Sequence, residues 1–342
     1  MGEKKLVYEV SIIRPLVIFL LVVFHCLCIY IGSWDSIESI IRIPIYYWIA
    51  NLISGFRIET IALVAGYIFA YQNIDLKRYI PFFPLMRKKF LRLIVPCWFF
   101  GVFYYFLVMY NHINWKESIY YILNGAGHLW FLPMLFWCFV FLWLIHHYQP
   151  NKFWTFITLS VLSILPMPSL PFGLTRMPHF AFYAYAGYCL WIYREQIFEK
   201  FLKRKWIILF ITAYLVLLYM NCSLKHFGAE EYELPLYAKI LTRVLKYFIV
   251  FTGISALYLI VCSYTINPHF KPANWVIQSS KICYGVYIFH QFILKYLYYQ
   301  TPLPEYAGSY WLPWIALCIA LPLSIILSIL FLRTKFGHFL IG

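Results

Sequence analysis

The sequence predicts an all-α fold, a polytopic transmembrane bundle of about ten helices with both termini in the cytoplasm. Three observations lead to this prediction: long apolar segments recur, charged residues are scarce, and Lys and Arg concentrate in alternate loops. Of the 342 residues, 63% are hydrophobic and only 12% are charged. Soluble domains carry about 25% charged residues. The composition therefore excludes a soluble globular protein and indicates a membrane protein.

Ten segments are apolar over nearly the length that a spanning helix needs, about 20 residues. The fifth and sixth segments are short, and they enclose a proline-rich turn that runs from Pro166 to Pro171. No loop between the segments is long enough for a separate domain, so residues 1–342 are interpreted as a single integral membrane domain with no appended soluble domain. The segments are 11–32, 45–71, 90–110, 129–147, 153–168, 178–193, 206–222, 238–264, 282–300 and 310–332.

The basic residues predict the orientation. Lys and Arg accumulate in the cytoplasmic loops of membrane proteins. With the N-terminus inside, most of the 28 Lys and Arg residues fall in cytoplasmic loops, from Lys4 and Lys5 to Arg333 and Lys335. We therefore predict an N-in and C-in multi-pass protein of the cell (inner) membrane. Because topology explains most of the net charge of +15, we expect membrane lipid, and no nucleic acid, among the partners.

The nine cysteines lie almost entirely inside apolar segments, and no two of them form a C-x-x-C pair. Structural zinc sites and redox motifs use such closely spaced cysteines. We interpret these cysteines as small buried hydrophobic residues and expect no metal.

Ionisable residues inside the apolar segments are the first functional candidates, because a charge at the centre of the bilayer costs about 2.5–3.5 kcal/mol on insertion scales. Arg14 and His25 lie in the first segment, 11 residues apart. This spacing is close to three helical turns, about 16 Å along the axis, so both residues should face one side. One groove could then hold a long ligand between them. The alternative is that Arg14 extends to the interface and His25 bonds a neighbouring helix.

Arg57 and Glu59 interrupt the second apolar segment. Residues two apart on a helix do not share a face. Each is therefore expected to meet a group on another helix or in a water-filled cavity. A structural ion pair between helices is the alternative.

The densest basic patch follows the second segment and comprises Arg87, Lys88, Lys89 and Arg92. Its charges suit the phosphates of coenzyme A, but a topological signal or contact with anionic lipid head groups explains them equally. Further polar candidates are His128 with Trp130, at the start of the fourth segment, and Tyr287 with His290 in the ninth. A structural hydrogen bond is the alternative role for each of these histidines.

Taken together, these motifs resemble the acyltransferase 3 family of bacterial membrane proteins, and the resemblance spans most of the chain. Arg14 and His25 match the family's Arg-x10-His element, and Ala65-Gly66-Tyr67 is close to its Ser-Gly-Tyr. Two departures matter: Lys89 replaces the first arginine of an Arg-x-x-Arg element, and Ala65 replaces serine. The other matching elements are Arg57-Ile58-Glu59-Thr60, Lys89 to Arg92 with Pro96, His128-Leu129-Trp130-Phe131-Leu132 and Tyr284-Gly285-Val286-Tyr287-Ile288-Phe289-His290.

The resemblance implies transfer of an acyl group, most often acetyl, from cytoplasmic acyl-CoA to a hydroxyl of a cell-surface or lipid-linked glycan, so acyl-CoA and a carbohydrate acceptor are the expected partners. Succinyl and longer acyl groups remain open. A neutral imidazole can remove a hydroxyl proton at ordinary pH, so His25 is the candidate general base. Glu59 would orient it or hold Arg57, and Arg57 would stabilise the oxyanion. Phosphate binding is assigned to Arg14, Lys89 and Arg92, and the tunnel or acceptor site to His128, Trp130, Tyr287 and His290.

A second function class fits the same composition. The chain could export a glycan or a small acid without chemistry, with Arg57 and Glu59 as a substrate or proton site. Transfer of label from acetyl-CoA to glycan in membranes distinguishes an enzyme from such a transporter.

Overall fold

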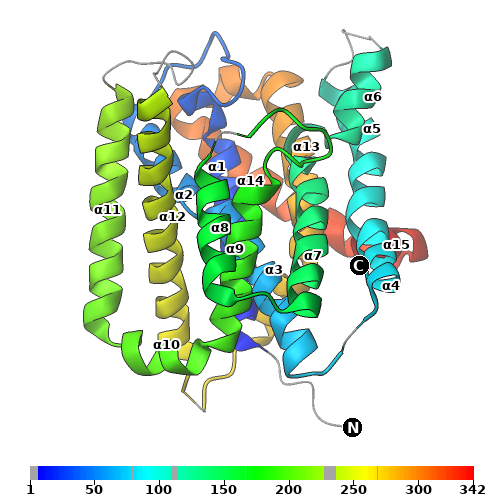
Figure 1. Cartoon of the computed structure of the whole chain (residues 1–342). Helices are drawn as coiled ribbons and strands as arrows, with labels where there is room; N and C mark the ends of the chain where they lie inside the picture. The colour runs from blue at the N-terminus through cyan, green and yellow to red at the C-terminus, as the bar shows by residue number, and fades with distance from the viewer. Residues whose placement is uncertain (1–6, 79, 109–114, 166, 227–235, 268) are drawn as a thin grey trace. The chain divides into compact units, whose positions relative to one another are not determined.

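The computed structural model describes residues 7–78, 80–108, 115–165, 167–226, 236–267 and 269–342 (Figure 1). Every regular element within these ranges is a helix, so the prediction of an all-α fold is confirmed. Lys4, Lys5 and Pro166, which entered the predicted topology and turn, lie outside the described residues.

Fifteen α-helices, two short 3-10 helices (η1 and η3) and one π-helical turn (η2) follow one another in the described ranges. Their bounds are α1 Tyr8–Cys26, η1 Cys28–Ile31, α2 Pro44–Ser54, α3 Arg57–Ile74, α4 Phe82–Lys89, η2 Phe90–Ile94, α5 Val95–Val108, α6 Trp115–Leu123, η3 Gly127–Trp130, α7 Phe131–Tyr148, α8 Lys152–Ile164, α9 Met177–Ile192, α10 Arg194–Phe201, α11 Arg204–His226, α12 Leu236–Thr265, α13 Asn274–Tyr299, α14 Leu303–Arg333 and α15 Lys335–Ile341.

Seven helical stretches in the described ranges are long and apolar enough to cross a membrane, so the protein has the character of a multi-pass membrane protein. The predicted segments 153–168 and 178–193 correspond to α8 and α9, which are shorter than a full span. The segment 282–300 lies in α13, where His290, Gln291 and Lys295 interrupt the apolar run. The count of ten spans and the orientation therefore stay predictions. The seven stretches are Tyr8–Cys26, Pro44–Ile74, Phe82–Leu107, Gly127–Tyr148, Arg204–Ser223, Ile240–Thr265 and Leu303–Arg333.

The chain divides into two compact units, which are described separately. The boundary between them falls within α3 and again within α13, so both helices contribute to both units. The first unit comprises Met1–Ser36, Arg42–Ile61 and Tyr193–Cys283, and the second comprises Ile37–Ile41, Ala62–Ile192 and Tyr284–Gly342.

In the first unit, α11 and α12 pack side by side (Figure 1). Their core is formed by Tyr214, Leu218 and Cys222 of α11 with Ile249 of α12, and Phe56 packs against it. The Tyr214 hydroxyl also donates a hydrogen bond to the main-chain oxygen of Leu52. This core therefore contacts the chain on both sides of the junction between α2 and α3.

The predicted segment 45–71 is two helices, because the chain breaks at Gly55 and Phe56. The Phe56 ring lies 5.6 Å from the Tyr214 ring, edge to face. A Cβ at Gly253 of α12 would fall 2.8 Å from Phe56 Cδ1, so only glycine leaves room for this ring. The Phe56 carbonyl then accepts the first helical bond of α3, from the Thr60 N–H.

In the second unit, α3 and α9 approach each other backbone to backbone. A Cβ built on Gly66 would lie 1.8 Å from the main-chain oxygen of Ala184, and one on Gly187 would lie 1.9 Å from that of Leu63. Small residues permit such close crossings between membrane helices, where packing replaces the hydrophobic effect as the main attraction. Gly66 belongs to the Ala65-Gly66-Tyr67 motif, and this contact gives its glycine a structural role.

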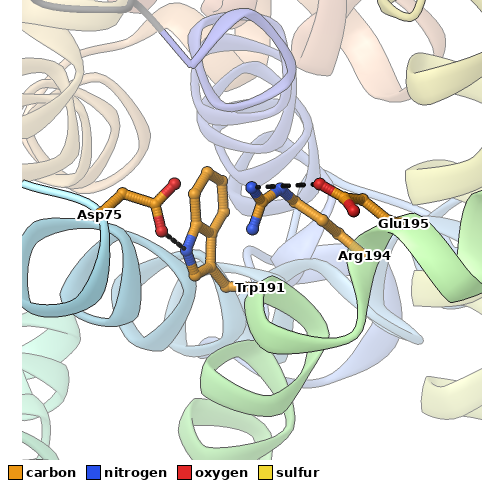
Figure 2. Close-up of polar contacts among 4 residues, drawn as sticks. All are labelled: Asp75, Trp191, Arg194 and Glu195. Atoms are coloured by element: carbon orange, nitrogen blue, oxygen red, sulfur yellow. Dashed lines mark hydrogen bonds and ion pairs between the residues drawn. The ribbon is translucent and has the colours of Figure 1, made fainter.

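Aromatic packing extends the contact between α3 and α9 toward their ends. The Trp191 ring lies edge to face with Tyr67 and with Tyr71, at 4.9 Å in each case. Its Nε1–H donates to Asp75 Oδ1 at 2.9 Å (Figure 2). Figure 2 also draws a 3.7 Å ion pair of the first unit, between the neighbouring residues Arg194 and Glu195 of α10, which is too exposed to add much stability.

Replacement of Gly66 by alanine should destabilise the protein, because the new methyl group would overlap main-chain atoms of Ala184, which cannot move away as a flexible side chain can. Overpacking of this kind costs about 1–3 kcal/mol, and thermal unfolding of the detergent-purified protein measures it. Gly101→Ala is the matched control, since its Cβ would lie 3.4 Å from the nearest atom, a side-chain carbon of Ile122. Equal melting temperatures for the two variants would contradict the close crossing.

Candidate active site

The break between α2 and α3 sets the position of two predicted site residues in the first unit. Arg57 is the first residue of α3, and Glu59 lies in its first turn. A carboxylate is favoured there because the N-terminus of a helix carries partial positive charge. Arg57 and Glu59 are only 5% and 6% exposed. Both charges are therefore held inside an apolar unit.

The Arg57 guanidinium lies on the face of an aromatic ring of α1. Its central carbon is 3.4 Å from the centroid of Phe24, a cation–π contact worth about 2 kcal/mol when water is excluded. The group is also within electrostatic range of Glu59, Cys28 and Tyr214. Among the described residues, Arg57 Nε has no hydrogen-bond partner. A buried arginine with an unmatched N–H keeps donor capacity for a ligand.

His25 occupies the last turn of α1, next to Phe24, and is 9% exposed. Its ring stacks on Trp34, with centroids 5.8 Å apart and planes 12° from parallel. It also meets the Phe24 ring edge to face at 5.6 Å. One aromatic residue, Phe24, thus touches both the imidazole and the guanidinium. The structure brings His25, Arg57 and Glu59 into one buried polar region of the first unit.

Arg14 lies in α1 together with His25. That the two residues face one side stays a prediction from their spacing. The side chain of Arg14 is exposed, whereas that of His25 is buried.

The side chains of the basic patch in the second unit have different surroundings. The Lys89 ammonium lies 3.5 Å from the ring centroid of Phe139, in α7. Arg92 is exposed, and its main-chain oxygen accepts a 2.8 Å hydrogen bond from the Tyr284 hydroxyl. Lys89 directly precedes the π-helical turn η2, and Arg92 lies within it. Such turns occur as single wide turns inside α-helices, often at functional sites.

His128 is held by α13 through three hydrogen bonds. Its main-chain N–H donates to Gln291 Oε1 at 2.9 Å, and its main-chain oxygen accepts from the Tyr287 hydroxyl at 2.5 Å. Its ring Nε2 lies 3.0 Å from the main-chain oxygen of Ile288. Since a carbonyl oxygen only accepts, Nε2 carries the proton. In the neutral ring Nδ1 is then an acceptor, and within the described ranges it has no partner.

His290 faces His128, with ring centroids 5.2 Å apart, and is fully buried. Its Nδ1 lies 2.9 Å from the main-chain oxygen of Val286, so this nitrogen is the protonated one. Tyr287 contacts the His128 ring edge to face at 5.3 Å. The structure therefore brings three of the four predicted tunnel or acceptor residues together.

Trp130, the fourth of these residues, lies at the end of η3 and is half-buried. The Arg176 guanidinium covers its ring at 4.0 Å, and Phe180 of α9 packs beside it at 5.7 Å. A cation on an indole face presents its N–H groups outward, toward anions or hydroxyls. In the described part of the chain, no three His, Cys, Asp or Glu side chains are close enough to hold a metal ion.

A family model described as an acyltransferase domain matches residues 7–333. The chain belongs to the acyltransferase 3 family. It is therefore a membrane acyltransferase that transfers groups other than aminoacyl groups. Searches of the curated proteins and of the solved structures found no match to this chain. The membership rests on nearly the full length of the chain.

The candidate site contains residues that the sequence alone did not single out. Trp34, Phe24 and Tyr214 surround the ionisable groups of the first unit as ordinary aromatic residues, and 22% of the chain is aromatic. Arg176 did not stand out in the sequence as a candidate site residue, because it lies in the loop that follows a proline-rich turn. Gln291 did give a signal, because an amide next to His290 in an apolar run requires a partner.

Loss of the Gln291 side-chain oxygen should destabilise the acyltransferase. In Gln291→Leu the buried N–H of His128 loses its acceptor, and an unsatisfied buried donor costs about 1–3 kcal/mol. The melting temperature of the purified protein measures the loss. Gln278→Leu, at an exposed position of the same helix, is the control. Comparable melting temperatures for both variants would mean that α13 does not hold η3 through this bond.

Proposed function

We propose that this acyltransferase moves an acyl group, most often acetyl, from cytoplasmic acyl-CoA to a hydroxyl of a cell-surface or lipid-linked glycan in the cell (inner) membrane. The observation that carries the proposal is the buried polar region of the first unit, with His25, Arg57 and Glu59 all less than a tenth exposed. Keeping three ionisable groups in an apolar environment is expensive and usually serves a ligand or a reaction.

His25 is the proposed general base. The acceptor hydroxyl gives its proton to the imidazole while its oxygen forms a bond to the carbonyl carbon of the thioester. The carbon–sulfur bond then breaks, and the leaving thiolate of coenzyme A takes the proton back from the imidazolium. The stacked Trp34 limits rotation of the ring, so the nitrogen that meets the hydroxyl stays oriented.

Arg57 is the proposed stabiliser of the oxyanion. The carbonyl oxygen gains negative charge during attack, and a fixed donor in a dry site lowers the energy of that state. The unmatched Nε–H of Arg57 supplies such a donor, and Phe24 holds the guanidinium plane in place. Glu59 balances the arginine charge in the resting enzyme, which keeps the cation from binding other anions.

The donor phosphates are assigned to Arg14, Lys89 and Arg92, under the N-in and C-in orientation. Arg92 is the strongest candidate of the three because its side chain is exposed, whereas the Lys89 ammonium already lies on the Phe139 ring. A lysine also lacks the planar fork with which arginine binds phosphate through two bonds. The acceptor carbohydrate is assigned to His128, Trp130, Tyr287 and His290, whose ring faces and nitrogens suit a sugar.

The variant His25→Ala should lose acyl transfer by about 100-fold to 10,000-fold, the range that a general base contributes. Release of free coenzyme A from acetyl-CoA by purified protein, with a hydroxyl acceptor present, is the measurement. The control is His147→Ala, which changes an exposed histidine stacked on Trp143. Wild-type turnover by a normally folded His25→Ala protein would remove this residue from the mechanism.

The variant Arg92→Ala should raise the KM for acetyl-CoA about tenfold and leave kcat nearly unchanged, because one charge-assisted bond to a phosphate is lost before chemistry begins. Steady-state kinetics measures both constants. Arg78→Ala removes another exposed arginine from the same predicted cytoplasmic side and should have little effect. If both variants shift KM equally, Arg92 contributes only general positive charge.

A further inference from the structure

An open groove of about 600 Å³ lies in the second unit, along α4 and its junction with η2 and α7. Pockets that hold small molecules commonly measure about 300–1,000 Å³. We call it the α4 groove, and its lining consists of Phe83, Pro84, Met86, Arg87, Phe90 and Phe136. We propose that the α4 groove binds one anionic phospholipid, with an acyl chain along its aromatic wall and the phosphate on Arg87.

The aromatic wall suits a lipid chain. The Phe90 and Phe136 rings meet edge to face at 6.3 Å, and Phe83 at the rim is 82% exposed. Hydrocarbon surroundings are as apolar as these side chains, so exposure of apolar surface alone does not favour one lipid there. A groove can favour one bound lipid, because it makes more van der Waals contacts with an acyl chain than a convex helix face can make.

Arg87 supplies the selectivity for a phosphate. It is the one basic residue among those that line the groove, and its side chain is exposed. Of the other residues in the basic patch, Lys89 lies on the Phe139 ring, and Arg92 lies inside η2 but not in the lining of the groove. A guanidinium beside an apolar channel matches a phosphate beside acyl chains. The proposed donor contact at Arg92 does not depend on this site.

The location of the groove also favours a lipid over a nucleotide. It lies at the start of the candidate span Phe82–Leu107, where the charged end of α4 adjoins apolar helix. A nucleotide brings several phosphates and a polar base, and each would need its own donor or acceptor. The lining offers one arginine and otherwise apolar side chains. One charge with hydrocarbon directly beside it is the chemistry of a phospholipid.

Lipid titration of the delipidated, detergent-purified protein, followed by native mass spectrometry, tests the proposal. We expect the first phosphatidylglycerol to bind more tightly than phosphatidylcholine with the same chains. Arg87→Gln should weaken phosphatidylglycerol about fivefold, the effect of one basic residue near an anionic lipid. It should weaken phosphatidylcholine less, because the choline cation offsets the charge of its phosphate. Lys88→Gln removes an equal charge from the same helix outside the lining and should have a clearly smaller effect.

Two results of this titration would overturn the proposal. Equal losses for Arg87→Gln and Lys88→Gln would mean that the patch attracts lipid only by its summed charge. Binding of glycerophosphoglycerol, which has the head group without chains, as tightly as the whole lipid would mean that the aromatic wall takes no part.

A measurement on the unmodified protein gives a second test that does not depend on the folding of a variant. A phosphatidylglycerol with a photoreactive group in one chain should label residues within Phe82–Phe90 and around Phe136 after irradiation, as mapped by peptide mass spectrometry. Excess unlabelled phosphatidylglycerol should suppress that labelling. Labelling confined to other helices, or not suppressed by competitor, would show that no lipid is held in the α4 groove.

Discussion

The contact between the Arg57 guanidinium and the Phe24 ring is the interaction on which the organisation of the first unit depends. A buried cation needs a fixed environment. The Arg57 guanidinium lies on the Phe24 ring, and the carboxylate of Glu59 belongs to the same helical turn. The break between α2 and α3 places Arg57 at the start of α3. The break in turn needs Gly253, which leaves room for Phe56, and Tyr214, which bonds the end of α2. Packing, backbone geometry and charge thus converge on one residue.

The sequence predicted the helical class and the candidate site residues of the first unit, because ionisable groups stand out in apolar segments. His25, Arg57 and Glu59 were identified in this way, and all three are buried. It did not predict the break at Gly55 and Phe56. No proline marks that point, and the break is specified by Tyr214 of α11 and Gly253 of α12, which come much later in the sequence.

The sequence alone also could not predict the hydrogen bonds between residues that lie far apart along the chain. Gln291, Tyr287 and the Ile288 carbonyl all bind His128 across more than 150 positions of sequence, and only the fold brings them together. Motif residues also turn out to serve different purposes. Gly66 permits contact between backbones, whereas Arg57 in the same helix keeps an N–H available. A match to a motif therefore does not by itself assign chemistry to each of its members.

The π-helical turn Phe90–Ile94 has a consequence for how the basic residues around it are compared. A wider turn shifts the angular phase of the helix, so side chains before it and after it no longer follow one α-helical stripe. Lys89 comes directly before this turn and Arg92 lies within it, and their i,i+3 spacing would place them on one face of a regular helix. Because of this phase shift, the basic residues of one short stretch lie beside different neighbours. A helical net drawn from the sequence alone would place Lys89 and Arg92 on one face.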